Sequence, residues 1–306
     1  MKRAYFLVNY GVAWFFYNWR FKGSTRVLKA VFSIIPLRKL EIKHPVGFHW
    51  NLDSRESLWT YLSSCESFTS KVVIEVAQKV ESAICIGANR GWYPLLIGQV
   101  NSGCDIYAFE PNSKTFDLLL SNIDSNAVSI NSHNFAIGKT SSHRDMYAYE
   151  NANDGMTTLH PSSAIANSFE KIEKVEVKTL DSVFPNTSQV SVPILLQMDI
   201  EGAEFEALLG SIAFLKKHSP VVICEINPLL LEAAGSTALE LFQLMNAQGY
   251  AIYWIDERGS FWSQKWDEPC KHLASLPQGS GSNYIFLKDS DLKSSLFPKF
   301  GTNSLV

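Results

Sequence analysis

The sequence predicts an α/β fold of the Rossmann-like type, in which helices cover both faces of a mostly parallel sheet. From residue 72 onward, short apolar runs bounded by turn residues alternate with segments of helical periodicity. The chain has 306 residues, of which 46% are hydrophobic, so it can bury a complete core without disulfides or metals. It carries no internal repeat or low-complexity tract, which favours a single main domain.

The chain divides into an N-terminal extension, a main domain and a C-terminal tail, at residues 1–70, 71–290 and 291–306. Within the extension, residues 24–35 have helical spacing that ends at Pro36, and the stretch 45–52 reads as extended. We therefore expect a partly helical, partly extended segment that acts as a cap or lid.

Five parallel strands are expected where buried apolar runs end at turn residues, at 82–87, 105–110, 127–137, 193–199 and 220–226. Two helices are expected from their apolar stripes, one of Phe205, Leu208, Leu209 and Ile212 and one of Leu239, Phe242 and Met245. After the run YAIYWI, a polar turn at 256–259 precedes a final strand at 282–287. The sequence thus predicts a seven-stranded, mostly parallel sheet with an antiparallel C-terminal strand.

Charge and cysteine content limit the function classes. The chain has 27 basic and 30 acidic residues and a net charge of −3, which gives no basic surface for a nucleic acid partner. Its five cysteines are odd in number and scattered, with no Cys-x-x-Cys pair. A reducing, cytoplasmic location is therefore expected.

The N-terminus is apolar and rich in aromatic residues from 4 to 17. This run is shorter than the roughly 20 residues that a transmembrane helix needs. The simplest interpretation is a helix packed on the domain. The alternatives are peripheral contact with the inner face of a membrane and a signal anchor.

A glycine-containing loop follows the first strand of the main domain. Gly87 and Gly91 would let the backbone approach a ligand, and Pro94 suits the first turn of the next helix. A dinucleotide-binding loop would need glycine at the position of Asn89, so a nicotinamide cofactor is disfavoured.

An acidic residue ends the second strand. Glu110 lies about twenty residues after Gly91, where a carboxylate can accept hydrogen bonds from ribose hydroxyls. The alternative interpretation is a helix cap before Pro111.

The most concentrated acidic site is the turn after the strand at 193–199. Asp199, Glu201 and Glu204 could hold the ammonium group of a ligand, act as general base or bind a divalent cation. Alternatively, they stabilise the N-terminus of the next helix. The residue pattern does not separate these roles.

Taken in order, the motifs CIGANRG, AFEPN, TLDSV, QMDIEGAEFEALLG and CEINP closely resemble the FkbM-type methyltransferase domain. The resemblance extends over about residues 70–290. An antiparallel sheet ending is also typical of the methyltransferase variant of the Rossmann fold. The resemblance implies S-adenosylmethionine as methyl donor. The implied acceptor is a hydroxyl of a sugar or glycan, a glycolipid precursor or a secondary metabolite.

Carried over to this chain, the resemblance assigns cofactor binding to Cys85, Gly87, Ala88, Asn89, Gly91, Glu110, Pro111 and Asp199. Transfer to an alcohol also needs a base for the hydroxyl proton. The candidates are Asp199, Glu201 and His160, the last in a segment expected to fold over the cofactor. His133 could line the adenine pocket, and Glu225 could face the acceptor.

Two residues depart from the family pattern. Cys85 stands where the family usually has aspartate, and Gln197 where lysine is common. Cys85 either weakens cofactor binding, marks a non-catalytic S-adenosylmethionine-binding or scaffold protein, or is a packing residue on a buried strand. A nicotinamide-dependent oxidoreductase is the remote alternative.

Overall fold

The computed structural model describes residues 40–54, 57, 60–61, 67–149, 157–162, 169–186, 189–255, 261–263, 268–277 and 280–289. The aromatic N-terminal run, the helix expected at 24–35 and the tail 291–306 lie outside the described residues.

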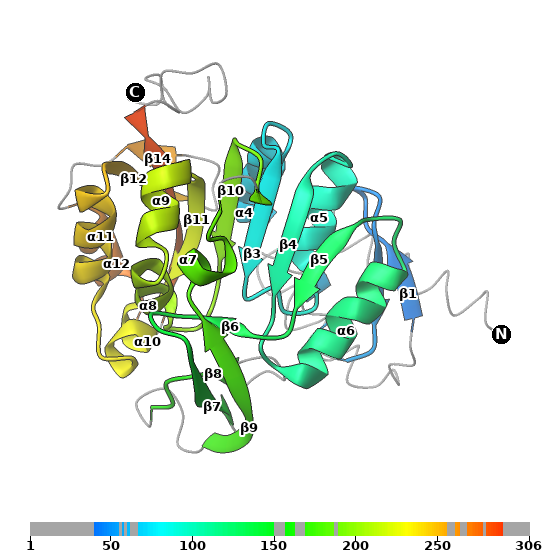
Figure 1. Ribbon diagram of the computed structural model, residues 1–306, viewed down its shortest axis with the longest axis horizontal. Coiled ribbons are helices and arrows are strands. Elements are labelled where there is room, and N and C mark those ends of the chain that lie inside the picture. Colours follow the sequence, from blue (N-terminus) through cyan, green and yellow to red (C-terminus); the bar gives the residue numbers. More distant parts are fainter. Residues whose placement is uncertain are drawn as a thin grey trace.

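The main sheet has the expected parallel centre (Figure 1). Its strand order is β13-β12-β14-β11-β10-β3-β4-β5, and the last five strands are parallel to one another. These five are β11 Val221–Ile226, β10 Ile194–Met198, β3 Ser82–Ile86, β4 Asp105–Phe109 and β5 Ile130–His133. Because these five strands are parallel, their carboxyl ends lie at one edge of the sheet.

The sheet ends in antiparallel strands, as the sequence predicts. β14 Ser282–Lys288 lies between β11 and β12 Tyr250–Ile255, and it is antiparallel to both. The short β13 Phe261–Ser263 pairs with β12 and adds one strand beyond the expected seven.

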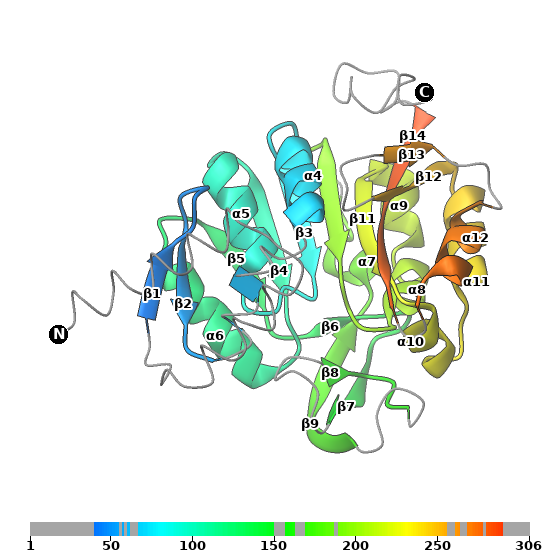
Figure 2. The ribbon, with the colours of Figure 1, turned by 180° about the vertical axis from the view of Figure 1, so that it is seen from behind.

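Two apolar layers cover the two faces of the sheet (Figures 1 and 2). Successive residues of β3 point to opposite faces, so Ala83 and Cys85 join one buried cluster while Ile84 and Ile86 join the other. The first cluster includes α4 Ser67–Ala77, α5 Trp92–Val100 and α6 Ser113–Asp124. The second includes α7 Leu180–Val183, α8 Glu204–Leu209, α9 Ile212–His218, α10 Pro228–Ala233, α11 Ala238–Ala247 and α12 Glu268–Ser275.

The strand expected at 127–137 is two strands. β5 ends at His133, and β6 Ala136–Ile137 leaves the main sheet to pair with β9. Asn134 lies at the break, where its side-chain amide donates hydrogen bonds to the carbonyls of Glu110 and Pro111 at 2.9 and 3.0 Å. These bonds turn the chain out of the sheet.

The single helix expected from Phe205 to Ile212 is likewise two helices. α8 ends before Gly210, where an added Cβ would lie 2.0 Å from the carbonyl oxygen of Gly138. The chain therefore approaches another backbone segment too closely for a side chain, and α9 starts in a new direction.

The second predicted helix, α11, is confirmed with one change. It starts at a capping box in which Thr237 and Glu240 bond each other's backbone N–H. Phe242 and Met245 are buried as expected, but Leu239 is 46% exposed, so it does not belong to the apolar stripe.

A small second sheet lies beyond the carboxyl edge of the main sheet (Figure 1). Its order is β6-β9-β7-β8, with β7 Ser142–Tyr149, β8 Thr157–Thr158 and β9 Phe169–Lys178. Met146, Leu159, Val175 and Val177 form its own buried cluster with Ala136.

The described part of the extension contains a hairpin. β1 Leu40–Lys43 pairs antiparallel with β2 His49–Leu52, and Figure 2 shows the hairpin beside α6. Phe48 and Trp50 are fully buried and make edge-to-face contacts with Trp92 of α5. The hairpin is therefore part of the core.

Candidate functional site

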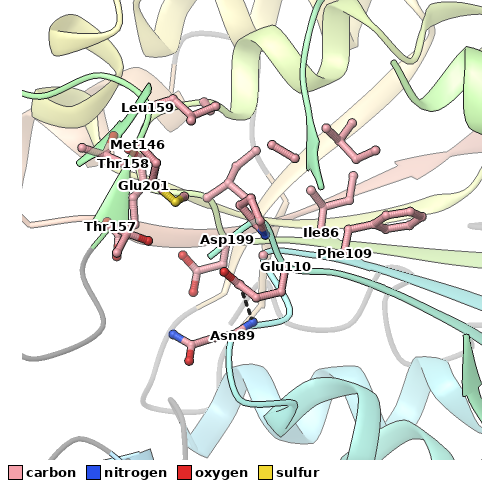
Figure 3. Close-up of a pocket in the computed structure, with 16 residues that line it drawn as sticks. Ile86, Asn89, Phe109, Glu110, Met146, Thr157, Thr158, Leu159, Asp199 and Glu201 are labelled. Carbon is pink, nitrogen blue, oxygen red and sulfur yellow. Dashed lines mark hydrogen bonds between the residues drawn. The ribbon is translucent and has the colours of Figure 1, made fainter. Parts of the chain in front are cut away.

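A pocket lies at the carboxyl ends of β3, β4 and β10 and is closed on one side by the small sheet (Figure 3). It comprises about 670 Å³, including the space at its open mouth. Its described lining residues are Ile86, Gly87, Asn89, Phe109, Glu110, Pro111, Ala136, Ile137, Met146, Thr157, Thr158, Leu159, Asp199, Ile200, Glu201 and Ala203. The position is the one where open α/β sheets hold ligands.

The loop after β3 turns sharply beneath this pocket. Gly87, Asn89 and Gly91 have φ angles of +76°, +48° and +94°, in the left-handed region. An added Cβ at Gly87 would lie 1.9 Å from the carbonyl oxygen of Asp199. Glycine at position 87 therefore lets β3 and β10 end side by side. Ala88 and Gly91 shape the loop but are not among the described lining residues.

Glu110 lines the pocket and also holds the loop. Its Oε2 accepts a hydrogen bond from the Asn89 N–H at 3.0 Å, and its Oε1 accepts one from the Asn112 N–H at 2.9 Å. The side chain that caps α6 is Asn112, which accepts from the Thr115 N–H. An ionised carboxylate can accept several hydrogen bonds, so Glu110 is chemically suited both to hold the loop and to accept from a ligand.

Asp199 opens onto the pocket and is otherwise enclosed by protein. Its backbone N–H donates to the Ile86 carbonyl at 3.1 Å, which fixes the end of β10 against β3. Burial raises the pKa of its carboxyl group, and a side-chain hydrogen bond with Glu225 partly opposes this shift. Glu225 is thus coupled to the site from the end of β11.

The rest of the acidic turn divides into two roles. Glu201 lines the pocket in a left-handed conformation with φ +52°, and its carbonyl accepts a hydrogen bond from Thr158 Oγ1 at 3.1 Å. Glu204 points inward instead, where its carboxylate accepts from the backbone N–H groups of Ile200 and Gly202. Burial raises the pKa of Glu204 to about 7. Glu204 therefore stabilises the turn rather than lining the pocket.

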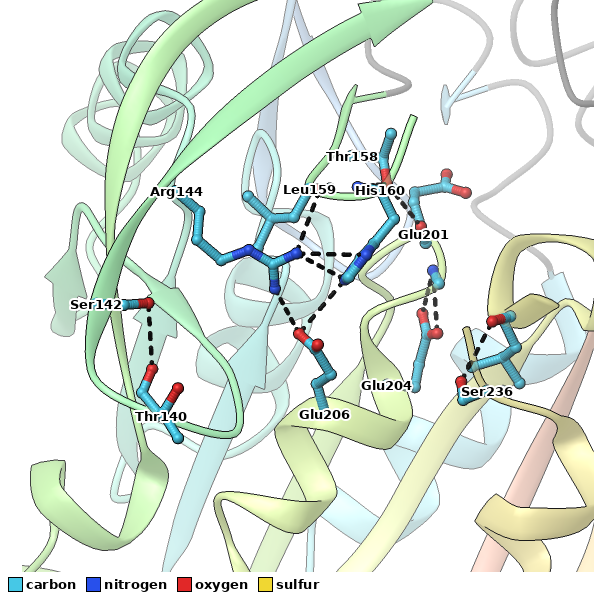
Figure 4. Close-up of polar contacts among 12 residues, drawn as sticks. Thr140, Ser142, Arg144, Thr158, Leu159, His160, Glu201, Glu204, Glu206 and Ser236 are labelled. Carbon is cyan, nitrogen blue, oxygen red and sulfur yellow. Dashed lines mark hydrogen bonds and ion pairs between the residues drawn. The ribbon is translucent and has the colours of Figure 1, made fainter. Parts of the chain in front are cut away.

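His160 lies beside the pocket wall but is not among its described lining residues (Figure 4). Its ring is 3.3 Å from Arg144 Nη2 and 3.3 Å from Glu206 Oε2, and Arg144 Nη1 is 2.6 Å from the same carboxylate oxygen. Hydrogen bonds and positive charge from His160 and Arg144 lower the pKa of Glu206. This cluster joins the small sheet to α8.

His133 and Cys85 are not among the described lining residues either. The His133 ring stacks on Phe109 at 5.0 Å, and its pKa is lowered by burial and by Lys178. Cys85 is fully buried inside β3, and burial raises its thiol pKa. The side chain at position 85 therefore faces the core, which supports the packing interpretation.

Replacing Cys85 with aspartate is expected to lower the free energy of unfolding by about 3 kcal/mol or more, because it buries a carboxyl group without a partner. Cys85→Ala should cost only about 1 kcal/mol. Urea denaturation of both variants tests this. An aspartate variant as stable as the wild type would show that position 85 reaches the pocket.

The small-sheet residues Met146, Thr157, Thr158 and Leu159 were not predicted individually, although the segment around His160 was expected to fold over the cofactor. They line the pocket because β7 and β8 fold back over it. Their location in the segment between the predicted strands was the only available signal.

The described residues contain neither a metal-ligand cluster nor a helix that could span a membrane. Among them, no group of three or more His, Cys, Asp and Glu side chains is arranged to hold a metal ion, so they do not support a divalent cation site. Within the same ranges, no helix is long and apolar enough to cross a membrane.

Comparison with known proteins identifies similar chains. Over 216 residues the chain is 22% identical to the hexuronic acid methyltransferase AglP of Haloferax volcanii, covering 66% of this chain and 83% of AglP. Two solved structures cover 76% of this chain, the FkbM methyltransferase of Methylobacillus flagellatus KT and the plantazolicin methyltransferase BpumL. Their TM-scores are 0.41 and 0.42, at 15% and 10% identity.

This chain spans 55% of the solved FkbM chain and 89% of BpumL. The protein-family model of the methyltransferase FkbM domain matches residues 86–252. This match covers 167 of the 306 residues, which is more than half of the chain. The matched region contains the glycine loop, Glu110, the acidic turn and the whole small sheet. The chain therefore belongs to the FkbM methyltransferase family.

Proposed function

We propose that this chain transfers a methyl group from S-adenosylmethionine to a hydroxyl of a sugar or glycan, a glycolipid precursor or a secondary metabolite. The observation that carries the proposal is the convergence of Gly87, Asn89, Glu110 and Asp199 on one pocket in a member of a methyltransferase family. The name of the relative AglP, a hexuronic acid methyltransferase, supports the sugar class of acceptor.

The residues present fit S-adenosylmethionine chemically. Glu110 lines the pocket and would accept hydrogen bonds from the ribose hydroxyls, since a carboxylate can accept several hydrogen bonds. The apolar side chains of Phe109, Ile137 and Met146 would contact the adenine. Either Asp199 or Glu201 would bind the ammonium group by charge, and the other would act as the base. When bound, the cofactor supplies an electrophilic methyl group.

Asp199 is our first candidate for the base that removes the acceptor's hydroxyl proton. Its raised pKa makes its carboxylate a stronger proton acceptor than a solvent-exposed aspartate. Glu201 lines the pocket nearby and is the second candidate. His160 is engaged by Arg144 and Glu206 and would act only through the position of the wall that it supports.

Asp199→Asn is expected to reduce methyl transfer by about a hundredfold or more, because it removes the base while preserving shape. The assay transfers labelled methyl from S-adenosylmethionine to a panel of sugars, uronic acids and glycolipids. Asp181→Asn is the matched control, because Asp181 is not among the described lining residues and accepts two backbone hydrogen bonds at the start of α9. Full activity of Asp199→Asn would exclude Asp199 as the base. A wild type that binds cofactor but methylates no hydroxyl would overturn the acceptor class.

We also propose a cytoplasmic enzyme whose aromatic residues 4–17 contact the inner face of a membrane, close to lipid-linked acceptors. The support is the sequence of that run, which is apolar and rich in aromatic residues and is followed by Arg20 and Lys22.

A further inference from the structure

The N-terminal extension contacts the glycine loop through an ion pair. Arg90 lies within the loop, yet it is not among the described lining residues and is only 8% exposed. Its Nη1 is 2.5 Å from Oδ1 of Asp53, directly after β2, and these side chains are 9% and 17% exposed. A nearly buried ion pair therefore joins the loop to the extension.

The backbone of the loop is held by the same segment through α6. Asn122 donates a hydrogen bond to the Arg90 carbonyl at 2.8 Å and accepts one from the Asn51 N–H at 3.3 Å. One turn further along, Asn126 accepts from the His49 N–H and donates to the His49 carbonyl, at 2.7 and 2.8 Å. The side-chain amides of Asn122 in α6 and of Asn126 just after it thus bond the backbone of β2.

This support bears on the conformation of the pocket-lining residue next to Arg90. Asn89 has a φ of +48°, a left-handed conformation that is strained for most L-residues and that asparagine adopts more readily than the others. The Asn89 side chain accepts a hydrogen bond from the Arg90 N–H at 2.7 Å, so the position of Arg90 bears directly on Asn89. Asn89 in turn lines the pocket and donates its N–H to Glu110.

We infer that Asp53 is a positioning residue of the cofactor site, which acts through Arg90 to hold the glycine loop in its binding conformation. The inference rests on the proposed cofactor. None of the described residues between 40 and 61 is among the described lining residues of the pocket, so the role inferred for them is support of the loop.

Calorimetric titration of the full chain with S-adenosylhomocysteine tests this inference. Asp53→Asn keeps the size of the side chain but removes its charge, which leaves the Arg90 guanidinium without its carboxylate. We expect the Kd to rise at least tenfold. Asp53→Glu should recover part of the affinity. The matched control is Glu41→Gln, which breaks an exposed ion pair with His49 on the same hairpin and should leave the Kd within twofold.

The double variant Asp53→Asn/Arg90→Met keeps the test valid if the single variant folds poorly, because it removes both charges of the Asp53–Arg90 ion pair. Its Kd should rise about as much as that of Asp53→Asn, since both break one contact. Thermal unfolding of each variant is measured alongside. Variants that melt earlier yet bind with wild-type affinity would show a purely structural pair and overturn the inference. A wild type that does not bind the ligand would instead refute the proposed cofactor.

Discussion

Replacing Glu110 with alanine is expected to weaken binding of S-adenosylhomocysteine by at least about a hundredfold. The carboxylate accepts two backbone hydrogen bonds that hold the loop, from Asn89 and Asn112, and it lines the pocket. Hydrogen bonds to a charged group contribute about 1.5–3 kcal/mol each, and about 1.4 kcal/mol corresponds to a tenfold change in affinity. The loss combines a displaced loop with a missing ligand contact.

Two further variants separate these contributions. Glu110→Gln retains one carbonyl oxygen and should bind with intermediate affinity. Glu240→Ala removes a carboxylate that also accepts a backbone N–H, but at the start of α11, so it should lower stability by about 1 kcal/mol and leave the Kd unchanged. Calorimetry measures all three. Wild-type affinity in Glu110→Ala would refute the assignment of Glu110.

Gly87→Ala is expected to abolish cofactor binding and to destabilise the fold by about 2–5 kcal/mol. The left-handed backbone contributes about 1–2 kcal/mol of this. The contact of the new Cβ with the Asp199 carbonyl contributes about 1–3 kcal/mol more, because β3 and β10 must separate where they end.

Gly235 provides a matched control at the same φ. Its φ is +77°, and an added Cβ would meet nothing within 4 Å, so Gly235→Ala should cost only the backbone share of about 1–2 kcal/mol. Urea denaturation compares the two variants, and calorimetry measures binding. Equal stability losses would show that the close approach at Gly87 does not constrain the loop.

The sequence was sufficient to predict the sheet and one side of the site. Each motif ends a parallel strand, and carboxyl ends of parallel strands meet at one edge, so the convergence of Gly87, Glu110 and Asp199 follows from local patterns alone. The antiparallel ending followed from the polar turn between two apolar runs.

The remaining features depend on contacts between distant segments. β6 leaves the main sheet because the Asn134 side chain bonds the backbone beyond β4, and the break at Gly210 reflects the approach of Gly138. The role of Arg90 depends on Asp53, 37 residues earlier in the chain. Periodicity and residue spacing within a short stretch of sequence do not predict these long-range contacts.

The surroundings of Cys85 likewise depend on how its strand packs in the folded chain. From the sequence, a cysteine in place of aspartate in a cofactor motif left three interpretations open: weakened cofactor binding, a non-catalytic protein, or a packing residue. The structure shows a fully buried thiol in the apolar cluster with Ala83 and Leu95. The motif position alone does not reveal to which face of the strand a side chain points.

The most direct measurement is a calorimetric titration of the full chain with S-adenosylhomocysteine and S-adenosylmethionine, with NADH as the comparison ligand. Our account predicts saturable binding of both adenosyl compounds at one site, mutual competition between them, and no heat from NADH. Absence of binding to either adenosyl compound, or saturable binding of NADH, would contradict the assignment of the pocket as an S-adenosylmethionine site.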